Sequence, residues 1–149
     1  MLLLSSCSIQ QYIDGTANPE ALPPDLGKDD AYMMVQLEGR NSHDRYLRKH
    51  FERNYRGNHL FVDNEELNTP RYADAEQYRY VFFVNMINLG YGTGGGASYT
   101  YYVYDRVTKK THTPRISGSW FSAYIQGYVI NLENQRAKNA PIDSRKVLE

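Results

Sequence analysis

The chain has 149 residues, and its 17 basic and 17 acidic side chains cancel to a formal net charge of zero. A neutral chain has no overall field to attract nucleic acid or anionic lipid, so the composition does not favour a nucleic-acid-binding protein. One cysteine excludes an internal disulfide, and the 14 tyrosines suit strands whose rings are half-buried while their hydroxyl groups reach water.

The single cysteine, Cys7, follows a leucine and two serines close to the start of the chain. This short stretch resembles the cleavage site of bacterial lipoproteins, in which the cysteine becomes the lipidated first residue of the mature protein. The resemblance implies that residues 1–7 are a residual signal and that Cys7 carries a lipid anchor at a membrane of the cell envelope. A complete signal has a basic region and about 7–15 apolar residues before the cleavage site. Either the true start therefore lies upstream of Met1, or the match is accidental and Cys7 is an ordinary free thiol.

Residues 8–29 contain three prolines, two glycines and four acidic residues, and their apolar side chains follow no period. Such a composition predicts a flexible tether with a root-mean-square length of roughly 25 Å. Ser8 replaces the aspartate that is associated with retention in the inner membrane of enteric bacteria. The resemblance therefore favours an outer-membrane lipoprotein that faces the periplasm, with the inner membrane and the cell surface as alternatives.

Residues 30–140 are expected to form one domain, followed by a polar tail over residues 141–149. Alternation of apolar side chains predicts a strand over residues 31–38 with one core face. A helix is predicted over residues 43–56, since it has one apolar stripe and a basic C-terminal end that the helix dipole favours. The stripe consists of Tyr46, Leu47, His50, Phe51 and Asn54. A short strand is predicted over residues 59–62, and an irregular connection follows it.

Residues 78–89 are the most apolar run and are apolar on both faces, which predicts a central strand covered on both sides. A glycine-rich hairpin loop leads from it into a strand over residues 98–106. The next strand, over residues 111–116, contains Pro114 and is expected at a sheet edge. A final helix is predicted over residues 119–138, where Gly127 would let a strand or a ring approach closely. Together these elements predict an α+β fold in which a single antiparallel β-meander sheet packs with two helices.

The chain contains no recognisable catalytic motif. Residues 90–95 match GxGxxG, but a strand follows them, so no helix N-terminus is available to bind a pyrophosphate, and we expect no cofactor. His43 and His50 are two helical turns apart, roughly 10 Å along the axis, which is too far for one metal ion. No serine lies in a GxSxG or SxxK context, so no catalytic residue is assigned.

The predicted helix over residues 43–56 is basic and carries interleaved tyrosines, a pattern that nucleic-acid-binding proteins use. Its cations are Arg45, Arg48, Lys49, Arg53 and Arg56. Asp44 and Glu52 share the helix, and an envelope location removes a nucleic-acid target. We expect these cations to pair with acidic loops of the same protein or to face anionic envelope polymers.

Taken together, these patterns favour a lipid-anchored, non-catalytic binding or assembly module whose partner is an envelope protein or a glycan. Its candidate binding groups are the hairpin glycines and one of two tyrosine pairs, because strand side chains alternate between faces. These residues are Gly92, Gly94, Tyr99, Tyr101, Tyr102 and Tyr104. The alternative is a small periplasmic hydrolase or carbohydrate-active enzyme with an unrecognised site. Two converging carboxylates or a His–Ser pair in a cleft would favour the enzyme, and a shallow aromatic patch would favour binding.

Overall fold

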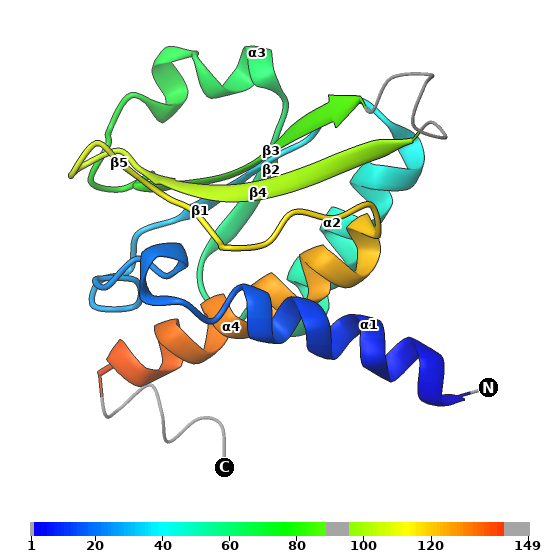
Figure 1. The fold of residues 1–149 in the computed structure, drawn as a ribbon. Coiled ribbons are helices and arrows are strands. Elements are labelled where there is room, and N and C mark those ends of the chain that lie inside the picture. Colours follow the sequence, from blue (N-terminus) through cyan, green and yellow to red (C-terminus); the bar gives the residue numbers. More distant parts are fainter. Residues whose placement is uncertain (1, 89–95, 142–149) are drawn as a thin grey trace.

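The computed structural model describes residues 2–88 and 96–141, with side chains from residue 9 onward. Within these residues, five strands form one sheet in the order β2-β1-β3-β4-β5 (Figure 1). The strands are β1 (Met33–Gln36), β2 (His59–Val62), β3 (Tyr80–Asn88), β4 (Ala97–Asp105) and β5 (Lys110–His112). The α+β class is therefore confirmed, and β3 is the central strand as predicted.

The helices cover the two faces of the sheet unequally (Figure 1). Three long helices lie on one face: α1 (Leu2–Gly15), α2 (Asn41–Asn54) and α4 (Phe121–Asn139). The other face carries only α3 (Asn64–Leu67) and the short 3-10 helix η2 (Pro70–Tyr72), which lie within the connection predicted to be irregular. A second 3-10 helix, η1 (Pro19–Ala21), follows α1.

The sheet is mixed, and the prediction of a purely antiparallel meander with two helices is wrong. β1 pairs in parallel with both β2 and β3, whereas β4 pairs antiparallel with β3 and with β5. α2 connects β1 to β2 and returns the chain to the end of the sheet at which β1 begins. β2 therefore runs parallel to β1. Residues 63–79 then lead back past β1 to β3 across the opposite face. The two crossovers run in opposite directions across the sheet and lie on opposite faces, as two crossovers of the same hand must.

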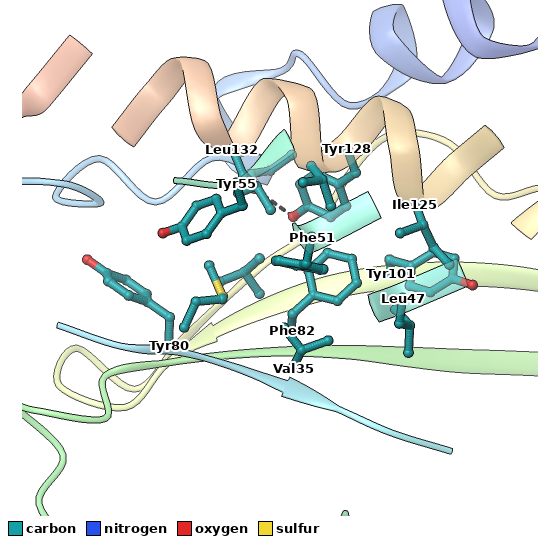
Figure 2. Packing of buried hydrophobic residues seen from close by; sticks show 14 of the residues in the cluster. Val35, Leu47, Phe51, Tyr55, Tyr80, Phe82, Tyr101, Ile125, Tyr128 and Leu132 are labelled. Atoms are coloured by element: carbon teal, nitrogen blue, oxygen red, sulfur yellow. Dashed lines mark hydrogen bonds between the residues drawn. The ribbon is translucent and has the colours of Figure 1, made fainter. Parts of the chain in front are cut away.

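The main core lies between the sheet and the three long helices (Figure 2). Phe51 of α2 and Phe82 of β3 meet edge to face, with ring centroids 4.9 Å apart. Ile125, Tyr128 and Leu132 of α4 are completely buried above them. Tyrosines are therefore part of the core, and the Tyr128 hydroxyl is satisfied by donating a hydrogen bond of 2.7 Å to the carbonyl oxygen of Ala21.

A smaller core lies on the other face, where Met34, Val62, Tyr72 and Val81 are buried together. Both faces of β1 are therefore covered, although the sequence predicted only one core face for this strand. β3 is covered on both faces only in its first half, since Asn85 and Ile87 further along it are exposed.

Residues 8–29 pack against the domain, so the prediction of a flexible tether is wrong. Tyr12 and Leu26 of this segment are buried in the main core. The Asn131 side chain of α4 donates hydrogen bonds of 2.8 Å to the carbonyl oxygen of Ile13 and to the hydroxyl of Thr16. The composition was misleading because these apolar residues are isolated in sequence and find their partners on α4, more than 100 residues away.

Gly127 explains how closely α1 approaches α4. A Cβ atom at this position would lie 2.9 Å from backbone atoms of Tyr12 and Ile13. The predicted close approach is confirmed, but the approaching element is a helix and not a strand or a ring.

Candidate functional site

The side chains of β4 show which tyrosine pair belongs to the core. Tyr101 faces the long helices and is completely buried, and Tyr99 on the same side packs against the core. Tyr102 and Tyr104 face the other side of the sheet, where both are half-buried. Tyr104 packs against the smaller core, whereas Tyr102 stacks on Phe83 with ring centroids 5.1 Å apart. Of the predicted tyrosines, Tyr102 is therefore the one that lies on an uncovered part of the sheet.

The uncovered part of this face is formed by the second half of β3 and the first half of β4, which extend beyond α3 (Figure 1). Its cross-strand pairs are Phe83 with Tyr102, Asn85 with Thr100 and Ile87 with Ser98. We call these six residues the open sheet face. Its side chains are aromatic, aliphatic or neutral and polar, and Ile87 is 56% exposed. Two of its six side chains are aromatic, and none is ionisable apart from the tyrosine hydroxyl.

The predicted hairpin glycines, Gly92 and Gly94, lie outside the described residues. Gly96, which precedes β4, has a backbone φ of +109°, a conformation that favours glycine. The loop joins β3 to β4, so it begins and ends next to the open sheet face.

A second candidate surface lies at the start of α4. A hollow of about 370 Å³ is lined by Ile9, Tyr46, Ser119, Trp120, Phe121, Ser122, Ala123 and Gln126. Trp120 is 61% exposed. It is the N-cap residue of α4, at the very start of the helix. Ile9 was missed because it lies in the segment predicted as a tether.

A histidine–serine pair lies at the edge of this hollow. The His50 Nε2 atom of α2 is 3.0 Å from the Ser122 Oγ atom of α4. Acyl-transfer enzymes use such a pair, with the imidazole as the base that removes the serine proton. Here burial, followed by the charges of Lys49 and Arg53, lowers the pKa of His50 to about 4. Among the described residues no carboxylate contacts His50, so the imidazole is a weak base without an orienting acid.

His43 is also a core residue. Its Nε2 atom is 2.7 Å from the Tyr101 hydroxyl, and its ring stacks on that of Tyr101. Burial lowers the pKa of His43, which favours the neutral imidazole, although the nearby Asp44 opposes this effect. In the described part of the chain, no three His, Cys, Asp or Glu side chains come together as metal ligands would.

Three aspartate carboxylates lie close together, and all three surround the side chain of Arg79. Asp25, Asp29 and Asp105 lie 3.3, 3.6 and 2.9 Å from the guanidinium of Arg79. Hydrogen bonds from Lys28 and from Arg79 hold the pKa of Asp25 below its ordinary value. A general acid needs a raised carboxyl pKa, so this cluster resembles a structural ion pair and not an acid–base site.

The cations of α2 surround a second hollow, of about 610 Å³. It is lined by Leu37, Asn41, Asp44, Arg45, Arg48, Lys49, Glu52 and Arg53. Four of these residues are basic and two are acidic, so the hollow has a local positive excess of two although the whole chain is neutral. None of the helices in the described ranges has the length and apolar character needed to cross a bilayer.

No family model, no curated protein and no solved structure matches this chain.

Proposed function

We propose that this protein is an envelope lipoprotein, acylated at Cys7, that acts as a non-catalytic binding or assembly module. The open sheet face is its binding surface. The observation that carries this proposal is the Phe83–Tyr102 stack at the border of the smaller core, both rings partly exposed, with the exposed side chain of Ile87 beside it. Uncovered apolar surface of this kind on a small domain marks an interaction site.

The composition of the open sheet face suits recognition of a neutral partner. Stacked aromatic rings offer a large contact area with few rotatable bonds, so little conformational entropy is lost on binding. Asn85 and Thr100 lie between the apolar groups in the strand register and add hydrogen-bonding capacity. These features fit the binding of an envelope protein or a glycan, and such binding requires no catalytic step.

The proposed anchor agrees with this role. Cys7 lies in α1, two residues before Ile9, where the described side chains of the domain begin. Acylation there would hold the domain directly at the membrane, without a long spacer. The proposed location is the periplasmic face of the outer membrane.

The anchor is tested by intact mass measurement of protein expressed from its own genomic context. We expect a mature chain that lacks residues 1–6 and carries a lipid on Cys7, and a Cys7→Ser variant that leaves the membrane fraction. A purified chain that keeps residues 1–6, or a variant that stays with the membrane, would contradict the proposal.

The binding surface is tested by capture of partners from envelope extract and by co-sedimentation with isolated cell-wall glycan. We expect a Tyr102→Ala/Ile87→Ala variant to lose the captured partner. Val107→Ala is the matched control, because Val107 is an exposed apolar residue outside the open sheet face. Capture of the same partner at the same strength by the folded double variant would refute this surface.

The alternative, a small hydrolase, rests on the contact between His50 and Ser122. A fluorophosphonate probe, which reacts with activated serines, separates the two functions. We expect no labelling that depends on Ser122. Labelling of the protein that Ser122→Ala abolishes would establish the enzyme and overturn the non-catalytic proposal.

A further inference from the structure

The hollow at the start of α4 combines an exposed indole with other apolar groups. Trp120 is the only tryptophan of the chain, and 61% of it is exposed. Tyr46 of α2, Phe121 of α4 and Ile9 of α1 line the same hollow, so three helices contribute to it. Indole and phenol rings favour the boundary between the apolar interior of a bilayer and water, because one end of each ring is apolar and the other is polar.

Positive charges lie directly beside this apolar surface. The Arg45 guanidinium is 5.3 Å and the Lys49 ammonium is 5.7 Å from the centroid of the Tyr46 ring. Both cations also line the basic hollow of α2, which holds two more arginines. Apolar rings flanked by cations are complementary to the anionic surface of a bilayer, since the headgroup phosphates attract the charges while the rings enter the boundary region.

The course of α1 brings this surface to the proposed anchor. Ile9 lines the hollow, and Cys7 precedes it by two residues of the same helix, which is about 3 Å along the axis. A lipid on Cys7 would therefore enter the bilayer next to Trp120. This link to the anchor rests on the proposed acylation, whereas the chemistry of the surface itself does not.

We infer that the protein docks on an anionic lipid surface through the edge formed by Ile9, Tyr46, Trp120, Phe121, Arg45 and Lys49, which we call the Trp120 edge. Trp120 enters the boundary region of the bilayer, and the two cations contact headgroup phosphates. The open sheet face lies on the opposite side of the sheet from α1 and α4 (Figure 1). Docking through the Trp120 edge leaves the open sheet face accessible to a partner.

The test uses the full chain with Cys7→Ser, so that no acyl group contributes, and vesicles of phosphatidylcholine with or without phosphatidylglycerol. We expect flotation with the anionic vesicles only. Because the chain has a single tryptophan, its emission reports on Trp120 alone. We expect this emission to shift to shorter wavelength on binding and to be quenched by brominated lipid.

Two variants of this chain examine the two parts of the Trp120 edge. Trp120→Ala should weaken vesicle binding, and Arg45→Glu/Lys49→Glu should weaken it by about tenfold or more, since each cation near the surface contributes appreciably. The matched controls are Val107→Ala and Lys109→Glu/Lys110→Glu, which alter an exposed apolar residue and two exposed lysines at the turn between β4 and β5. Both controls should bind as the parent chain does.

Three results would overturn the inference: no binding to anionic vesicles, equal losses in the control variants, or unchanged emission of Trp120 in the bound protein. None of them depends on acylation, because the tested chain lacks Cys7. A mature protein without lipid would conversely refute the proposed anchor and leave the vesicle result as it stands.

Discussion

Arg79 connects the N-terminal segment with the end of the sheet. Its guanidinium donates hydrogen bonds of 3.0 and 2.9 Å to the two carboxylate oxygens of Asp105, and it also contacts Asp25. Asp105 accepts two further hydrogen bonds from the amides of Val107 and Thr108 in the turn after β4. Burial alone would raise the pKa of Asp105. The hydrogen bonds together have the larger effect, so the pKa of Asp105 lies below its ordinary value.

We expect Asp105→Asn to lower the free energy of unfolding by about 3 kcal/mol or more, because it leaves the Arg79 charge buried without its main partner. Urea denaturation measures this effect. Asp29→Asn is the control, since Asp29 contacts the same guanidinium but is half-exposed, and its loss should cost less than about 1 kcal/mol. An equal loss in the free energy of unfolding for both variants would contradict this prediction, because the buried contact with Asp105 would then be worth no more than the exposed contact with Asp29.

Three buried histidines, His43, His50 and His112, should make the protein sensitive to acid. Burial lowers the pKa of each, and that of His50 falls from 6.5 to about 4. Between these values the unfolded chain binds protons that the folded chain does not, so the free energy of unfolding falls as the pH drops from 6.5 to 4.

His50 alone should account for a loss on the order of 2–3 kcal/mol across this range, at about 1.4 kcal/mol per pKa unit. Denaturation at several pH values, with the wild type and His50→Gln compared, measures its share. A variant whose pH dependence matches that of the wild type would contradict the assignment.

The tyrosines show what residue patterns can and cannot predict. Alternation along β4 correctly separates Tyr99 and Tyr101 from Tyr102 and Tyr104. It cannot say which pair is buried, because that depends on which face the long helices cover. The exposure of Trp120 could not be predicted for a similar reason: its spacing continues the apolar pattern of α4, but it lies at the start of the helix and is largely exposed.

At the scale of elements, the packing of α1 on α4 depends on Gly127. Gly127→Ala would favour an isolated helix by about 1 kcal/mol. In the protein its Cβ atom would meet backbone atoms of Tyr12 and Ile13 at 2.9 Å, and backbone cannot move aside without displacing α1. We therefore expect a net loss of stability and faster amide exchange in α1, measured by hydrogen–deuterium exchange. An unchanged exchange rate would show that α1 is not held at this contact.

Elements with a local pattern were predicted well, and those held by distant contacts were not. α2 was predicted because its buried residues share one stripe, and β2 lies over the predicted residues. The parallel pairing of β1 with β3 was missed because the crossover after β2 is anchored by Leu67 and Tyr72, which stand alone in a polar stretch. The hollow at the start of α4 could not be predicted either, since α1, α2 and α4 form it together.

At the scale of the whole molecule, the two faces of the sheet should contribute unequally to stability. Phe51 is completely buried in the main core, whereas Phe83 on the open sheet face is only partly buried, against the smaller core. We expect Phe51→Ala to cost about 3–5 kcal/mol and Phe83→Ala markedly less, in urea denaturation. A comparable cost for Phe83→Ala would mean that the open sheet face is covered in solution.

The contact between α1 and α4 also sets an order of events during synthesis. Thr16 and its partner Asn131 are 115 residues apart, so α1 cannot pack on α4 until α4 has been made. At about 5–20 residues per second, a ribosome needs roughly 6–23 s to cover that distance. Before α4 is made, the contacts that hold the N-terminal segment to α4 cannot form, so this segment is open to enzymes that cleave or modify it.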